Sequence, residues 1–290
     1  MRQIDLPLPN GGNLHAIDSE SGSDLLIYHH GTPAAGPLSH ELLEAAAAHD
    51  LRLVELVRPG YGRSTRQVDR TVASVASLAE VLADHIGAQR FVTMGWSGGG
   101  PHALATAALL PTRCSGAMLL ASVAPYDAVD LDFLDGMGED NIVEFGAALA
   151  GPAELEAFLT PMADGLRSIT ADEVVGSLAS LLPEVDRSFL DGPAGEELAA
   201  ELRFSVASGI WGWYDDDVAF TRPWGFDITA VRRPVAVWQG TEDLMVPFAH
   251  GRWLAARIPG AKSHLIDGHG HLSLAADFMT AGFGELRAWL

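Results

Sequence analysis

Short apolar runs alternate with helical patterns along this chain, and this alternation constrains its fold more than any other feature. Between two of the runs, Val75, Leu78, Val81, Leu82 and Ile86 form one apolar stripe at helical spacing. Alternating strands and helices favour right-handed crossovers and a mostly parallel sheet with helices on both faces. The sequence therefore predicts an α/β fold whose strands lie within residues 24–31, 51–60, 90–96, 116–123, 234–240 and 263–268.

The segment 125–226 has a different character, because it contains no run that is typical of a strand. Its apolar residues recur at helical spacing, and Gly-Pro pairs at 151–152 and 192–193 mark the places where helices begin. We therefore expect a core made of residues 1–124 and 227–290, with residues 125–226 inserted into it as a helical cap.

The charge of the chain excludes several classes of partner. Of 290 residues, 18 are Lys or Arg and 38 are Asp or Glu, so the formal net charge is −20. The segment 125–226 alone holds 21 Asp and Glu against 4 Arg. Such a chain repels nucleic acids and anionic membrane surfaces. We expect a small-molecule substrate, no nucleic-acid or membrane partner, and a monomer or homodimer.

The N-terminal residues and the cysteine content bear on the compartment. The first 18 residues lack a basic region followed by an apolar one, and Cys114 is the single cysteine, so no intramolecular disulfide forms. No apolar run is long enough to cross a bilayer. We expect a cytoplasmic protein.

The hexapeptide "GWSGGG" at 95–100 places Ser97 between a predicted strand and a predicted helix. Glycines two residues before and two residues after a serine allow a sharp turn that exposes its hydroxyl. A serine at a helix start is also a favoured capping residue, which is the simpler interpretation. The nucleophile interpretation requires an imidazole that accepts the serine proton and a carboxylate that orients the imidazole.

Asp243 and His271 are the candidates for these two partners, since each follows a late predicted strand. Glu242 and Asp127 compete with Asp243, and His269 competes with His271. Asp243 is favoured by its place in "GTEDLMVP", and His271 is the histidine that both follows glycine and precedes leucine.

Five segments match a known family: "HHGTP" (29–33), "RPGYGRS" (58–64), "GWSGGG" (95–100), "GTEDLMVP" (240–247) and "GHGHL" (268–272). With them the chain resembles the capped, single-domain proteins of the α/β-hydrolase fold. In that family the elbow serine is the nucleophile, an acid follows a late strand and a histidine precedes the last helix. The resemblance therefore implies a triad of Ser97, Asp243 and His271, and an oxyanion hole formed by the N–H groups of Thr32 and Gly98.

Other parts of the sequence narrow the resemblance. The chain lacks the "HGGG" of some lipases and esterases, and it has no aspartate at the elbow, so its resemblance to epoxide hydrolases and haloalkane dehalogenases stops at the fold. His30 is expected to brace the oxyanion loop or to line the substrate pocket, and Trp96, Trp211 and Trp213 are candidates for its apolar wall. No histidine pair has metal-ligand spacing, and the expected chemistry requires no metal or organic cofactor.

These observations predict a hydrolase that cleaves an ester or similar acyl bond of a small, apolar substrate through an acyl-enzyme. Two alternatives use the same fold: a small-molecule receptor that retains the triad, and a cofactor-free haloperoxidase-like or aminopeptidase-like enzyme.

Overall fold

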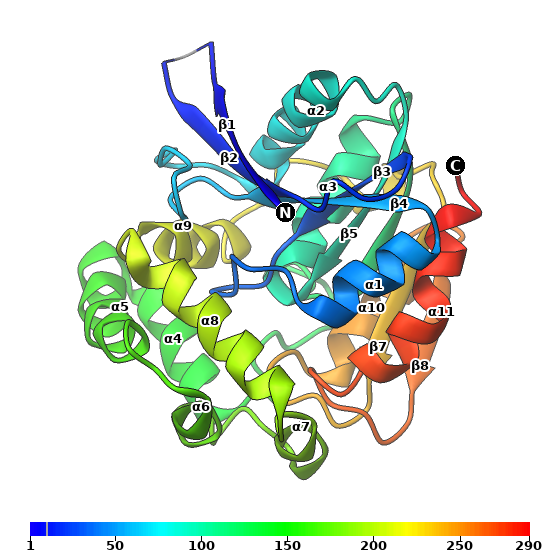
Figure 1. Cartoon of the computed structure of the whole chain (residues 1–290). Coiled ribbons are helices and arrows are strands. Elements are labelled where there is room, and N and C mark those ends of the chain that lie inside the picture. Colours follow the sequence, from blue (N-terminus) through cyan, green and yellow to red (C-terminus); the bar gives the residue numbers. More distant parts are fainter. Residues whose placement is uncertain (10) are drawn as a thin grey trace.

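A central eight-stranded sheet organises the protein, as the computed structural model shows for residues 1–9 and 11–290 (Figure 1). The strand order is β1-β2-β4-β3-β5-β6-β7-β8. The pairs β1·β2 and β2·β4 are antiparallel, and every other neighbouring pair is parallel. The strands are β1 (Arg2–Pro7), β2 (Asn13–Asp18), β3 (Asp24–His29), β4 (Leu51–Val57), β5 (Phe91–Trp96), β6 (Cys114–Leu120), β7 (Val235–Gly240) and β8 (Lys262–Ile266).

The predicted α/β fold with a mostly parallel sheet is confirmed, and its six predicted strands correspond to β3–β8. The sequence analysis missed β1 and β2, which form an antiparallel hairpin at one edge. In β1 only Ile4 and Leu6 are buried, so the alternation of apolar and polar residues that indicates a strand is short.

Helices cover both faces of the sheet because successive side chains of a strand point to opposite sides. On β3, Leu25 and Ile27 pack in one apolar cluster with α2 (Val75–Ile86), α3 (Gly100–Leu109) and α10 (Phe248–Arg257). Leu26, between them, packs in a second cluster with α1 (His40–Ala48) and α11 (Ala275–Arg287). Three short 3₁₀ helices connect these elements: η1 (Val72–Ser74), η2 (Ser97–Gly99) and η3 (Ile228–Ala230).

Residues 125–226, called the helical insert below, contain helices and no strand. Pro152 and Pro193 open two of the helices, as the Gly-Pro pairs predict. Figure 1 shows the insert gathered beside the sheet, apart from the helices on its two faces. Its helices are α4 (Glu139–Ala150), α5 (Pro152–Leu166), α6 (Ala171–Ser177), α7 (Glu184–Phe189), α8 (Pro193–Ala207) and α9 (Trp211–Phe220). No helix in residues 1–9 and 11–290 has the length and apolar character needed to span a membrane.

The turn between β5 and α3 is tightly packed. Ser97 has a φ of 54°, in the left-handed region that residues with a side chain seldom adopt. A Cβ on Gly95 would overlap the Gly99 carbonyl and lie 2.7 Å from the Gly100 nitrogen; one on Gly99 would overlap the His29 carbonyl. Because Gly95 and Gly99 have no Cβ, β5 and α3 can approach each other closely, and the resulting sharp turn exposes the Ser97 hydroxyl.

We predict that Gly99→Ala lowers the free energy of unfolding by about 3 kcal/mol or more, because backbone must move to admit the methyl group. Gly146→Ala is the matched control, since Gly146 lies in α4 and its Cβ would meet nothing within 4 Å. The control should be neutral or more stable by about 0.5–1 kcal/mol, from helix propensity. Urea denaturation measures both; equal effects would contradict this account of the turn.

Candidate functional site

The candidate site lies where several parallel strands end. Ser97 follows β5, Asp243 follows β7, His271 follows β8 and Thr32 follows β3. Because β3 to β8 are parallel, these residues meet at one edge of the sheet, which is the usual place for a ligand in open α/β sheets.

Asp243 and His271 contact each other directly. Oδ2 of Asp243 lies 2.8 Å from Nδ1 of His271 and also accepts a hydrogen bond from Nε2 of Gln239 at 2.9 Å. Oδ1 of Asp243 accepts from the backbone N–H groups of Met245 and Val246 at 2.9 and 2.8 Å. Four donors thus fix the carboxylate, and the carboxylate in turn orients the imidazole.

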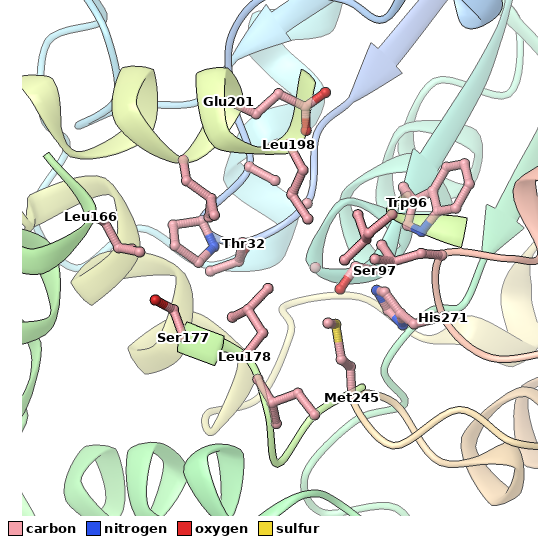
Figure 2. Close-up of a pocket in the computed structure, with 18 of the residues that line it drawn as sticks. Thr32, Trp96, Ser97, Leu166, Ser177, Leu178, Leu198, Glu201, Met245 and His271 are labelled. Atoms are coloured by element: carbon pink, nitrogen blue, oxygen red, sulfur yellow. The ribbon is translucent and has the colours of Figure 1, made fainter. Parts of the chain in front are cut away.

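The imidazole of His271 has an environment suited to accepting a proton. Burial alone would lower its pKa, but the charge and hydrogen bond of Asp243, together with the charge of Asp186, more than offset burial and raise the pKa above its ordinary value of about 6.5. With Nδ1–H donated to Asp243, Nε2 keeps its lone pair. Figure 2 shows the Ser97 side chain and the His271 ring pointing toward each other.

The competing residues lie elsewhere. Glu242 and Asp127 are exposed, whereas Asp243 is buried. His269 is half-buried, and its Nε2 lies 3.4 Å from the Asp277 carboxylate.

Thr32 and Gly98 come together across the site. A Cβ on Gly98 would lie 2.9 Å from the Thr32 Cβ and 2.9 Å from Cζ of Phe220. Gly98 also belongs to η2, which leads directly into α3, so its N–H is in the first turn of a helical segment. Such N–H groups have no partner within the helix and point toward anions.

His30 braces the loop that carries Thr32 and is absent from the described lining of the cavity, which corrects its expected pocket role. Its ring is buried: Nε2 accepts the Arg58 backbone N–H at 3.1 Å, so Nδ1–H donates to the Gly31 carbonyl at 2.7 Å. Burial and the nearby Arg58 charge hold the pKa of His30 well below its ordinary value, which keeps the ring neutral. Arg58 also donates to the carbonyls of His30 and Gly31, at 2.5 and 2.8 Å.

Asp216, on α9 of the helical insert, connects this loop to the insert. Its carboxylate accepts hydrogen bonds from Arg58 Nη2 and Arg70 Nη2, both at 2.6 Å, from Tyr61 Oη at 2.9 Å and from Thr32 Oγ1 at 2.8 Å. Burial alone would raise the pKa of Asp216, but the two guanidinium groups hold it well below its ordinary range. The ion cluster is buried, and it joins the insert to Thr32, which lies beside Gly98.

A cavity of about 1140 Å³ lies between the helical insert and the strand ends, and Ser97, Gly98 and His271 line part of it. Trp96 and Trp213 lie in its wall. Apolar side chains of the insert, among them Leu178 and Leu198, form much of the remaining wall (Figure 2).

Trp211 is not among the described lining residues, contrary to its expected place in the pocket. The guanidinium carbon of Arg66 lies 3.9 Å from the centre of the Trp211 ring, and Tyr214 packs against the ring edge-on. A cation over the ring face and an aromatic neighbour account for the position of the Trp211 side chain without a cavity contact.

The cavity wall is acidic as well as apolar. Its described lining contains eight carboxylate side chains and no Lys or Arg: Glu41, Asp140, Glu144, Glu173, Asp191, Glu197, Glu201 and Asp217.

Two of these acids, Glu144 and Asp217, are neighbours on α4 and α9. Trp213 Nε1 donates to Glu144 at 2.6 Å, while both carboxyl oxygens of Asp217 are buried without a donor among the described residues. Burial and mutual repulsion raise the pKa of Asp217 well above its ordinary value, and burial raises that of Glu144 to about 7. The pair therefore retains at least one proton near neutral pH.

The sequence analysis missed Asp186, a buried residue of α7. Asp186 accepts hydrogen bonds from the backbone N–H of His271 at 2.7 Å and from the N–H and hydroxyl of Ser273 at 2.8 and 2.7 Å. No local signal marks it, because an aspartate near a helix start is usually explained by the helix itself.

We predict that Asp216→Asn lowers the free energy of unfolding by about 3–5 kcal/mol, because Arg58 and Arg70 are left as buried charges without a carboxylate. Asp215→Asn is the control from the next position. Asp215 pairs with Arg66 at 2.8 Å, and that Arg side chain is 28% exposed, so its charge stays partly solvated and the loss should be about 1 kcal/mol. Urea denaturation at pH 7 measures the difference; a smaller loss for Asp216→Asn would sink this account.

Comparison with known proteins agrees with this geometry. The sequence profile of the alpha/beta hydrolase fold matches residues 24–277. A pimeloyl-[acyl-carrier protein] methyl ester esterase of Nitrosomonas europaea is 26% identical over 263 residues, 89% of this chain and 92% of that protein. A non-heme chloroperoxidase of Streptomyces lividans is 28% identical over 77% of this chain and 76% of that protein. Among solved structures, an alpha/beta hydrolase fold protein from Nakamurella multipartita superposes with a TM-score of 0.71 at 21% identity, covering 99% of both chains. The chain belongs to the α/β-hydrolase-fold family.

Proposed function

We propose that this protein is a serine hydrolase that cleaves a carboxylic ester, or a related acyl bond, through an acyl-enzyme. The observation that carries the proposal is the 2.8 Å contact of Asp243 with His271, whose ring faces Ser97 in the wall of the cavity (Figure 2). The esterase named among the relatives supports the same reaction class.

The proposed first step forms a bond between Ser97 Oγ and the acyl carbon. His271 Nε2 accepts the hydroxyl proton, Asp243 stabilises the imidazolium, and the proton then passes to the departing alcohol as its bond to the acyl carbon breaks. In the second step His271 takes a proton from water, whose oxygen bonds to the acyl carbon. The bond between that carbon and Ser97 Oγ then breaks, His271 returns the proton to Oγ, and the acid is released. No metal or organic cofactor takes part.

The N–H groups of Thr32 and Gly98 are proposed to hold the oxyanion of each tetrahedral intermediate. The close approach of these two residues supports the assignment, as does the place of Gly98 at a helical N-terminus. Loss of one such donor typically reduces kcat by about 10²–10³-fold. The helical insert is proposed to act as the cap that closes the acyl pocket, with Trp96 and Trp213 in its wall.

We predict that a fluorophosphonate probe labels Ser97, and that Ser97→Ala and His271→Ala each lower kcat for a p-nitrophenyl ester by about 10⁴-fold or more, since each removes one member of the proton relay. Mass spectrometry locates the adduct, and His269→Ala is the matched control that should retain activity. Peroxide-dependent turnover is assayed in parallel, because a chloroperoxidase is also a relative. A folded protein that refuses the probe and hydrolyses no ester would overturn the proposal and favour a receptor-like role.

The acidic wall of the cavity bears on the charge of the substrate. The described lining holds eight acidic side chains and no Lys or Arg. Burial keeps Asp217 and Glu201 protonated, and the remaining carboxylates would repel an anionic acyl chain without a cation in the wall to compensate. A neutral, largely apolar acyl group fits both the charge and the apolar side chains.

Among p-nitrophenyl esters of similar length, we predict that kcat/KM for the neutral butyrate exceeds that for the anionic hemisuccinate by at least about tenfold. The difference should shrink as salt is added, because salt screens the partly exposed carboxylates. Steady-state kinetics at two ionic strengths test this prediction. Equal kcat/KM values for the two esters would show that the wall does not select by charge.

A further inference from the structure

Asp186 is a buried carboxylate of the helical insert whose hydrogen-bond donors all lie on the loop that carries His271. Oδ2 accepts from the His271 N–H, and Oδ1 accepts from both the N–H and the hydroxyl of Ser273. The side chain of Asp186 is fully buried. Within the described residues no Lys or Arg forms an ion pair with it, so its charge is satisfied by this loop. Burying a charge is costly unless it is fully hydrogen-bonded, so the loop and the carboxylate fix each other.

The loop is also shaped to admit this carboxylate. A Cβ on Gly270 would lie 2.5 Å from Cγ and 2.6 Å from Oδ1 of Asp186, so any other residue at 270 would displace the carboxylate. The Gly270 N–H in turn donates to the Ser273 hydroxyl at 2.9 Å, and that hydroxyl donates to Asp186. The N–H group of His271 and the N–H and hydroxyl groups of Ser273 are therefore arranged around the single carboxylate of Asp186.

His271 consequently lies between two carboxylates that belong to different parts of the fold. Asp243, after β7, holds its side chain through Nδ1, while Asp186, on α7, holds its backbone N–H. These are also the two charged groups that act on the imidazole, and both favour its protonated form. Asp186 does not line the cavity in the described structure, so it does not act by touching substrate.

We propose that Asp186 is a positioning residue that holds the His271 loop in its reactive conformation, so that the catalytic base is assembled only when α7 is docked. This inference rests on the proposed hydrolase function. It makes the insert part of the catalytic apparatus, because withdrawal of α7 would remove three hydrogen bonds from the loop of the base. A misplacement of about 1 Å in a reacting group can cost about 10²-fold in rate.

The test compares Asp186→Asn with the wild-type protein on p-nitrophenyl butyrate. The amide oxygen can still accept from Ser273, but the amide NH₂ faces the His271 N–H, so that bond is lost. We expect kcat to fall by about 10–100-fold while KM changes less than about twofold. The wild-type rate should rise with pH through the raised pKa of His271, and in the variant this rise should move to lower pH because one anionic neighbour is gone.

Asp18→Asn is the matched control. Asp18 is equally buried and accepts hydrogen bonds from Arg52 and from the Glu20 N–H, but it lies on β2, near the sheet edge opposite β8. Its loss should destabilise the fold without moving the pH profile. A second variant, Gly270→Ala, keeps the Asp186 charge while displacing the carboxylate, and it should lower kcat in the same way.

The outcomes separate this inference from the proposed function. An NMR titration of the His271 imidazole needs no turnover, and its midpoint should fall in Asp186→Asn whether or not an ester is cleaved. Two results would overturn the positioning role. One is an Asp186→Asn protein with wild-type kcat and an unmoved His271 titration midpoint. The other is an Asp18→Asn protein whose His271 titration midpoint falls as far as in Asp186→Asn. If the wild-type protein hydrolyses no ester and resists the fluorophosphonate probe, the hydrolase proposal fails independently of the NMR result.

Discussion

The buried ion cluster around Asp216 is the interaction on which the geometry of the site depends. One carboxylate of the insert faces Arg58 and Arg70 of the core, and both the carboxylate and Arg58 also contact Thr32 Oγ1. A cluster of this kind tolerates little displacement of the carboxylate, because without it two guanidinium charges are left out of water. The loop that carries Thr32 and the helix α9 are therefore held as one unit, although they are far apart in the sequence.

A second carboxylate of the insert acts on a different loop of the site. Asp186 holds the loop of His271, as Asp216 holds the loop of Thr32. The sheet supplies the strand ends that bring Ser97, Asp243 and His271 together, and the insert supplies acceptors that fix two of the loops. This division explains how the long loops after the parallel strands keep a defined geometry, because buried hydrogen bonds and ion pairs to the insert hold them.

The sequence predicts much of this architecture where a local pattern has a single physical cause. The apolar runs predict β3 to β8, and the glycines around Ser97 predict the elbow, because each pattern reflects burial or close approach within a few residues. Long-range contacts leave no such pattern: nothing near Asp186 indicates that it faces residue 271, and Trp211 has the same local signature as Trp213. The ring of Trp213 lies in the cavity wall, whereas that of Trp211 packs against Arg66. Which of two neighbouring aromatic residues faces a pocket is decided by the rotation of the helix and its packing, and the sequence around them does not encode either.

Three consecutive aspartates on α9 show how the acidity of the insert is used. Successive residues of a helix are rotated by about 100°, so neighbours in sequence enter different environments. Asp215 pairs with the partly exposed Arg66, and Asp216 lies among buried guanidinium groups that lower its pKa. Asp217 faces Glu144 in the cavity wall, and burial together with the repulsion of Glu144 raises its pKa despite the charge of Arg70. The same side chain is thus the partner of a partly exposed arginine, a buried anion among guanidinium groups and a proton-retaining acid at three adjacent positions. The net charge of the insert alone would suggest a solvated surface, yet these carboxylates contribute to stability and to the character of the pocket because of where the helix directs each one.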